Sequence, residues 1–196
     1  MKRLKKLFIS LLALCVVFGC ASKIPHRVAP DYNKKGMRLI AVMPVKNETA
    51  DVKAAQLLRE KIINELYFKG YPKIPPGVID EKLSSVYGKM ADSRQGNIPP
   101  RIVGNLLGVD AVLYSTLEKC KTSYVLFYAP TSISITFEMR SVKTGETLWS
   151  TQYGTVKRCY SISRKRLEIE SSQVYESVIQ EVLDKAMETL PDGPDI

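Results

Sequence analysis

The stretch Ser132-Ile133-Ser134-Ile135-Thr136-Phe137-Glu138-Met139-Arg140 carries the clearest pattern in the chain, a strict alternation of polar and apolar side chains. Successive side chains of a β-strand point to opposite faces, so the alternation predicts a strand with one buried face and one wet face. The turn Lys143-Thr144-Gly145-Glu146 follows, where Gly145 is able to adopt a positive φ. The chain is then expected to return as a second strand over residues 147–158.

The residues on both sides of this hairpin predict more of the same sheet and a helix. Val109–Lys119 is expected to be the strand before the hairpin, which completes an antiparallel meander. A helix is expected from about Ser172 to Leu190, where apolar residues recur every three or four positions. The basic run Arg164-Lys165-Arg166 between the hairpin and this helix is interpreted as an exposed loop, with contact to lipid headgroups as the alternative.

The first half of the chain predicts a parallel strand with helices. Arg38–Val45 is a near-continuous apolar run, which is typical of a strand buried in a parallel sheet. The other elements expected here are a helix capped by Asp51 and stopped by Gly70, a short or edge strand near residues 71–74, a helix over residues 78–90, and a helix opened by Pro100 and closed by Gly108.

Together these elements predict an α/β fold, a single α/β sandwich over residues 37–190. Its sheet is mixed, with a C-terminal antiparallel meander and helices packed on it. Residues 191–196 are expected to be a C-terminal tail.

The N-terminus has the order of a secretory signal. A basic head ends at Lys6, and residues 7–18 form an uncharged apolar run that is too short for the ~20 residues of a membrane-spanning helix. The stretch Val16-Val17-Phe18-Gly19-Cys20 resembles the lipobox of bacterial lipoproteins, although Phe18 departs from the usual small or β-branched residue. Residues 1–19 are therefore predicted to be a signal peptide that is removed, and Cys20 is predicted to carry lipid.

The residues after Cys20 bear on location and reach. By resemblance to Gram-negative sorting, Ala21 and Ser22 imply the outer membrane and its periplasmic face. Residues 20–36 are polar, contain prolines and show no apolar period, so they are interpreted as the lipidated N-terminus and a tether. His26 is the chain's one histidine and is expected to be a solvated residue of that tether.

Charge makes nucleic acid an unexpected partner. The chain has 29 Lys and Arg against 20 Asp and Glu, and removal of the four basic residues of the signal leaves 25 minus 20, or +5. The basic residues are scattered, and an exported protein seldom meets nucleic acid. A mildly basic, solvated surface is expected instead.

Cysteine usage leaves one question open. Cys15 leaves with the signal and Cys20 accepts lipid, so Cys120 and Cys159 remain in an oxidising compartment. They either form a disulfide, which requires Cα atoms within ~4.4–6.8 Å, or stay as two thiols.

The residues expected for catalysis or metal binding are scarce. General acid–base and nucleophilic catalysis usually recruit histidine, which is found only in the predicted tether. A tetrahedral metal site needs about four Cys or His ligands, and the predicted domain offers two cysteines. No enzymatic activity, metal, cofactor or small-molecule substrate is expected.

One apolar and aromatic segment admits two interpretations. Tyr124-Val125-Leu126-Phe127-Tyr128 is either an exposed hairpin tip that contacts a membrane or a neighbouring subunit, or the leading end of the long strand that continues to Met139.

Three blocks of this sequence resemble a family of bacterial lipoproteins of unknown function: Ala41–Thr49, Leu107–Tyr114 and Lys143–Trp149. The likeness covers roughly residues 37–190. It implies a fold similar to the curli-secretion lipoprotein, to the amino-terminal domain of TolB and to the lipoprotein activators of penicillin-binding proteins. Such relatives bind proteins or assemble into rings, and the family has no agreed catalytic residues to transfer.

The functional expectation is an outer-membrane-anchored periplasmic lipoprotein that serves as a non-enzymatic subunit or accessory of a secretion-like cell-envelope assembly. Its partners are then the membrane, through the N-terminal lipid, and either another protein or further copies of the chain. The alternative is a regulatory protein-binding module that activates a periplasmic cell-wall enzyme. A tether of ~20–24 Å is short for projecting through the cell wall, which favours the first.

Overall fold

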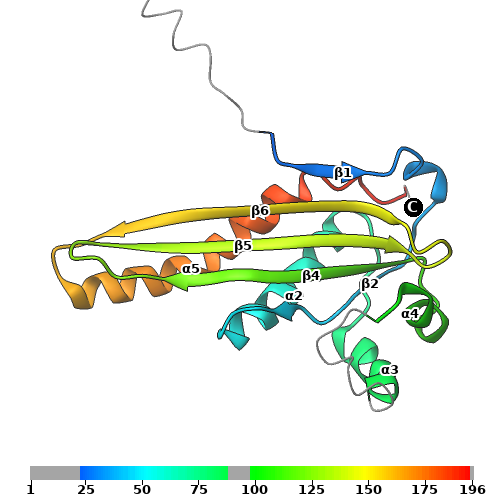
Figure 1. Cartoon of the computed structure of the whole chain (residues 1–196), viewed down its shortest axis with the longest axis horizontal. Helices are drawn as coiled ribbons and strands as arrows, with labels where there is room; N and C mark the ends of the chain where they lie inside the picture. Colours follow the sequence, from blue (N-terminus) through cyan, green and yellow to red (C-terminus); the bar gives the residue numbers. More distant parts are fainter. Residues whose placement is uncertain (1–22, 88–97, 195–196) are drawn as a thin grey trace, which may run out of the picture.

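The computed structural model describes residues 23–87 and 98–194, and Cys20 lies outside the described residues. They form one mixed sheet in the order β1-β6-β5-β4-β2, with β3 paired to β4 (Figure 1). The strands are β1 His26–Val28, β2 Ile40–Val42, β3 Lys46–Asn47, β4 Ala111–Thr122, β5 Tyr128–Ser141 and β6 Thr147–Tyr160. The helices are the 3-10 turn η1 Asn33–Lys35, then α2 Val52–Phe68, α3 Pro76–Tyr87, α4 Pro100–Leu107 and α5 Arg164–Met187. The predicted α/β fold with a mixed sheet is confirmed.

The antiparallel hairpin of β5 and β6 is the longest feature of the sheet, and it confirms the alternation. Every second residue of β5 from Ala129 to Ser141 is buried, while the residues between are partly exposed. The register sets Phe137 opposite Thr151 and Met139 opposite Trp149. Gly145 closes the β5–β6 turn with φ +77°, as predicted.

Strand β2 pairs in parallel with β4 and is buried on both faces, as the apolar run predicts. Ile40 and Val42 face a core with α2 and α5, whereas Ala41 faces a second core with α3 and α4. Helix α4 packs so closely that a Cβ on Gly104 would lie 2.1 Å from Val142 Cγ1. Helices therefore cover both faces of the sheet at this end, which makes it a sandwich.

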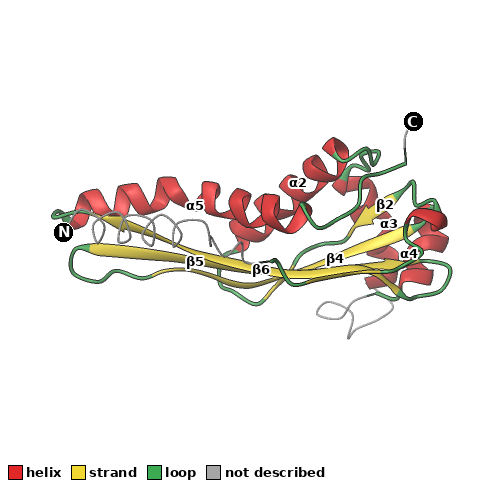
Figure 2. Ribbon diagram, turned by 90° about the horizontal axis from the view of Figure 1, so that it is seen from above, coloured by secondary structure: helices red, strands yellow, loops and turns green. Residues whose placement is uncertain are grey.

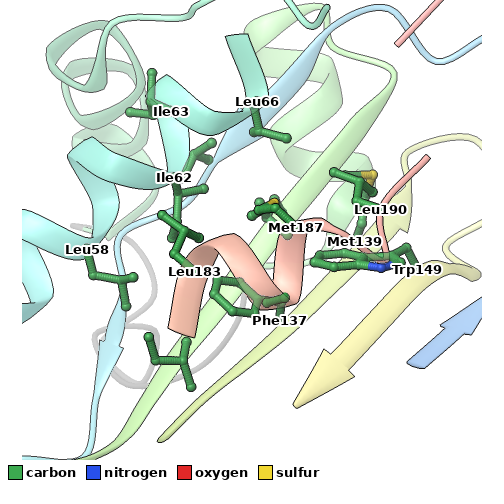
Figure 3. Close-up of a cluster of buried hydrophobic side chains, with 14 of the residues drawn as sticks. Leu58, Ile62, Ile63, Leu66, Phe137, Met139, Trp149, Leu183, Met187 and Leu190 are labelled. Carbon is green, nitrogen blue, oxygen red and sulfur yellow. The ribbon is translucent and has the colours of Figure 1, made fainter. Parts of the chain in front are cut away.

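The main core lies between the sheet, α2 and α5 (Figure 3). Phe137 and Trp149 are fully buried, and their ring centroids are 5.9 Å apart. Leu183 and Met187 of α5 lie over these rings, with Leu58 of α2 beside them. Each large apolar side chain buried in this way contributes ~1.5–3 kcal/mol, so this cluster holds both helices on the sheet.

Asp51 caps α2 as predicted, because its carboxylate accepts a hydrogen bond from Ala54 N at 3.0 Å. Pro100 opens α4, and Gly108 ends it with φ +68°. The expected helix over 78–90 is α3, although Met90 lies outside the described residues.

Two expected elements are wrong. Residues 71–74 form no strand, because the prolines in and after this segment remove the backbone donors that strand pairing needs. The Tyr71 side chain is instead buried in the core. Helix α5 begins at Arg164, well before Ser172, so the basic run is the first turn of a helix and not a loop. Ion pairs one turn apart, Arg164–Glu168 at 3.1 Å and Arg166–Glu170 at 2.8 Å, favour this extension.

The expected tether needs a correction as well. His26–Val28 forms β1, which pairs antiparallel with residues 149–151 of β6. The Thr151 hydroxyl donates to Pro25 O at 2.8 Å. Tyr32 is buried, and its hydroxyl hydrogen-bonds that of Tyr71 at 2.7 Å. The fold therefore begins before residue 37, and His26 is an exposed residue of an edge strand.

We predict that Tyr32→Ala lowers the free energy of unfolding by ~3–5 kcal/mol, as deletion of a buried aromatic side chain does. Tyr67→Ala is the matched control, because Tyr67 is 54% exposed on α2, and it is expected to cost ~1 kcal/mol or less, mainly through the lost contact of its ring with the Lys73 ammonium. Urea unfolding followed by circular dichroism measures both. Equal stability of Tyr32→Ala and the parent would show that residues before 37 are a tether after all.

Candidate interaction site at the hairpin tip

The β4–β5 turn places the apolar segment at the far end of the long hairpin, away from α3 and α4 (Figure 1). Val125 N donates to Tyr128 O at 2.9 Å, and Tyr128 N donates to Val125 O at 2.8 Å. Leu126 between them has φ +38°, a conformation that non-glycine residues rarely adopt. Residues 124–127 are thus an exposed hairpin tip, and Tyr128 is the first residue of β5.

The connection between β6 and α5 lies beside the β4–β5 turn at this end. Ser161 N donates to Phe127 O at 2.9 Å, and the rings of Tyr128 and Tyr160 lie 6.0 Å apart. The exposed side chains gathered here, which we call the apolar tip, are Tyr124, Val125, Leu126, Phe127, Tyr160 and Ile162. Leu126 is 84% and Ile162 92% exposed. Sequence reasoning missed Tyr160 and Ile162, because only the register of β5 with β6 brings them to the tip.

Helix α5 supports the apolar tip from one face of the sheet (Figure 2). Leu167 packs against Ala129 and Cys159 in a small buried cluster. The Arg164 guanidinium lies 5.1 Å from the centroid of the Tyr124 ring, a cation–π distance. The Tyr124 hydroxyl also hydrogen-bonds the Ser171 hydroxyl at 3.2 Å. These contacts fix the base of the tip while its outer side chains face solvent.

The surroundings of the apolar tip are basic. Residues 157–170 contain five Lys and Arg and two Glu, which leaves 5 minus 2, or +3. Both glutamates are paired with arginines of the first turn of α5. We call residues 157–170 the basic collar. An apolar tip next to this basic collar is more typical of an interaction surface than of a solvated loop.

The structure keeps Cys120 and Cys159 as free thiols. Cys120 lies opposite Ile133 on β5, and Cys159 lies opposite Ala129 on the other edge of that strand. Two strand spacings, ~9.6 Å, separate β4 from β6. This separation exceeds the Cα distance that a disulfide allows, so in this fold the two cysteines lie too far apart to be joined.

Cys120 belongs to a short hydrogen-bond chain instead. Its thiol donates to the Tyr175 hydroxyl at 3.2 Å, and that hydroxyl donates to Asp51 Oδ2 at 2.8 Å. Burial raises the pKa of the Cys120 thiol, and burial with the neighbouring Cys120 and Asp51 raises the pKa of Tyr175. A thiol kept protonated is a poor nucleophile, so this group links α5 to α2 and is unsuited to catalysis.

On the side opposite α5, beyond the end covered by α3 and α4, the sheet face is polar. Glu118 accepts hydrogen bonds there from Thr136 at 2.6 Å, Gln152 at 2.7 Å and Ser134 at 2.9 Å. The Thr136 hydrogen bond, joined by those of Gln152 and Ser134, lowers the pKa of the Glu118 carboxyl. Glu118 is therefore an ionised residue that ties three strands together.

The pocket between η1, Tyr71 and the C-terminal residues has a volume of about 350 Å³. Its titratable lining groups are Tyr32, Tyr71 and Asp192. Burial raises the pKa of both tyrosines, and Asp192 pairs with Lys69 at 2.6 Å. This set lacks a nucleophile beside a base.

Residues 23–87 and 98–194 contain no cluster of three or more His, Cys, Asp or Glu side chains placed to hold a metal ion. In the same part of the chain, none of the helices has the length and apolar character needed to span a membrane.

Residues 30–193 match the model of the family described as "Putative lipoprotein GNA1162-like", and the chain belongs to this family. The family resemblance carried by the three sequence blocks is confirmed.

Individual relatives are distant. The chain is 26% identical over 148 residues to "Putative lipoprotein NMB1124/NMB1162" of Neisseria meningitidis serogroup B, which covers 75% of this chain and 68% of the relative. The crystal structure of lipoprotein GNA1162 from Neisseria meningitidis matches with a TM-score of 0.56 and 24% identity, over 73% of this chain and 99% of that one. This match confirms the fold alone. A PelC dodecamer from Paraburkholderia phytofirmans matches with a TM-score of 0.49 and 17% identity, over 88% of this chain and 98% of that one, and at this level it supports no inference.

We predict two alkylated cysteines, Cys120 and Cys159, when the mature protein is denatured in iodoacetamide without a reductant and weighed by mass spectrometry. Under native conditions both are expected to react slowly, because Cys159 is buried and Cys120 is partly buried. A reductant-treated sample is the control. Alkylation that appears only after reduction would contradict two free thiols.

Proposed function

We propose that this chain is an outer-membrane-anchored periplasmic lipoprotein, held by lipid on Cys20, that acts as a non-enzymatic subunit or accessory of a cell-envelope assembly. The observation that carries the proposal is the shape of the sheet. Its three longest strands extend well beyond the sandwiched end, and they present backbone edges and an apolar tip that the described residues leave uncovered.

The open edge of β6 supports a protein-binding role. Strand β1 pairs only with residues 149–151, so the outer backbone edge from Gln152 to Tyr160 has no partner strand among the described residues. Unpaired donors and acceptors of an edge strand bind an added strand from another chain. Lys157 and Arg158 lie on this edge. Their charges disfavour non-specific strand addition, so a partner strand has to accommodate two cations.

The polar face beside this edge is suited to the same role. Val156 is 46% exposed on β6, next to Ser132 of β5. Helices α3 and α4 cover this face only at the sandwiched end, and no described helix covers it along the distal part of the long strands (Figure 2). A partner that adds to the β6 edge would therefore also contact a wet, helix-free surface.

The pocket between η1, Tyr71 and the C-terminal residues lacks a nucleophile beside a base, which also favours a non-enzymatic role. Its tyrosines are held protonated by burial and its aspartate is ion-paired. The family and the two Neisseria meningitidis relatives named above are described as lipoproteins, and none of these is described as an enzyme.

The test places a photo-crosslinking amino acid at Val156 in cells that produce the lipidated protein. The matched control is Val52, which is 65% exposed at the start of α2 and remote from the β6 edge. We expect a discrete adduct from Val156 and none from Val52. The native mass of the detergent-extracted protein should then exceed that of one chain.

The composition of the adduct separates the two functional hypotheses. Adducts that contain only this chain, at multiples of its mass, support a homo-oligomeric subunit. A monomer joined to one larger protein supports the regulatory module that acts on a cell-wall enzyme. Equal labelling from Val156 and Val52, together with the mass of a monomer, would contradict the proposed use of the β6 edge.

A further inference from the structure

We infer that the apolar tip lies on the phospholipid surface of the membrane that holds the Cys20 anchor, so that the domain contacts its bilayer at two points. The inference rests on lipidation of Cys20, as proposed above. It assigns to the tip a ligand, an anionic lipid surface, that differs from the protein partner proposed for the β6 edge.

The side chains of the tip suit a lipid–water interface. Leu126, Phe127 and Ile162 are more than half exposed and have no polar atom that would gain from solvent. Tyr124 and Tyr160 add aromatic rings with a hydroxyl at one end, the type of side chain enriched at the level of lipid headgroups. Exposure of this whole group to water is unfavourable, and a bilayer surface relieves it.

The positive charge around the apolar tip favours an anionic lipid surface over a neutral one. The collar from Lys157 to Glu170 carries a net +3, and Arg164, Lys165 and Arg166 are all exposed. Basic residues beside an apolar insertion are attracted to anionic headgroups, and their long side chains reach the headgroups while the apolar ones enter the boundary.

Strand β1 directs the described residues before it, 23–25, toward the same end of the sheet as the apolar tip. Strand β1 runs antiparallel to β6, so the residues before His26 lead toward the end of β6 that carries the tip. The chain from Cys20 to Pro25 spans at most ~18 Å. Strand β6 rises ~30 Å from Thr151, which bonds Pro25, to Tyr160.

These two lengths restrict how the domain sits on its membrane. Because Cys20 lies at most ~18 Å from Pro25, the part of β6 at Thr151, which bonds Pro25, stays within about that distance of the lipid surface. With the chain before His26 leading toward the tip, the ~30 Å distal part of β6 reaches that surface when the strands tilt toward it. The tip then meets the bilayer without any change in the fold.

The test uses the full-length lipidated protein, reconstituted in phosphatidylglycerol-containing vesicles whose acyl chains carry bromine, a quencher of indole fluorescence. Phe127→Trp introduces an indole at the tip. The chain's own Trp149 is fully buried in the core, so it contributes a constant background. Phe68→Trp is the matched control, because Phe68 is 77% exposed at the end of α2 and outside the tip.

We expect the Phe127→Trp protein to show a blue-shifted emission that loses most of its added intensity in brominated vesicles, while the Phe68→Trp protein keeps its own. The effect should weaken in vesicles of phosphatidylcholine alone, which lack the anionic headgroups. Quenching that is equal for both variants, or absent from both, overturns the inference.

The result also separates this inference from the proposed function. If Phe127→Trp is unquenched while Val156 still yields adducts, the tip does not touch lipid and the envelope-subunit role stands. If crosslinking at Phe127 then joins two copies of the chain, the tip is a protein contact, and the membrane inference is wrong.

Discussion

The packing of α5 along the buried face of the β5–β6 hairpin is the interaction on which the rest of the structure depends. At the sandwiched end, Leu183 and Met187 pack with Phe137 and Trp149 in the main core, and α2 completes the layer (Figure 3). At the distal end, Leu167 of the same helix packs against Ala129 and Cys159. One continuous helix therefore backs strands that would otherwise be an exposed ribbon, and a ribbon of this kind is only marginally stable in water without such packing.

The parts of this fold with strong periodicity were predictable from sequence. The alternation over residues 132–140 fixed the face of β5, and the apolar run at 38–45 indicated a parallel strand. The errors occurred where tertiary contacts override local pattern. Strand β1 is too short for a period, and its stability comes from pairing with β6. The first turns of α5 are charged on most sides, and only Leu167 and Ser171 are buried there. The sequence pattern of these turns therefore resembles that of an exposed loop.

The candidate site was predictable only in part for a related reason. The segment 124–128 is conspicuous in sequence because it is apolar, but Tyr160 and Ile162 join it through the register of β5 with β6. The open edge of β6 likewise follows from the short length of β1, which no composition reveals. Cys120 and Cys159 invited pairing by their number, whereas the intervening strand keeps them apart.

Helix α5 makes the distal part of the hairpin a rigid support for the apolar tip. Hydrogen exchange of the mature protein, followed by mass spectrometry, tests this most directly on β5, which lies between β4 and β6. Amides of residues 131–135 are expected to exchange as slowly as those of residues 136–141 near the main core. Fast exchange confined to residues 131–135 would show instead that the tip sits on a loosely held ribbon.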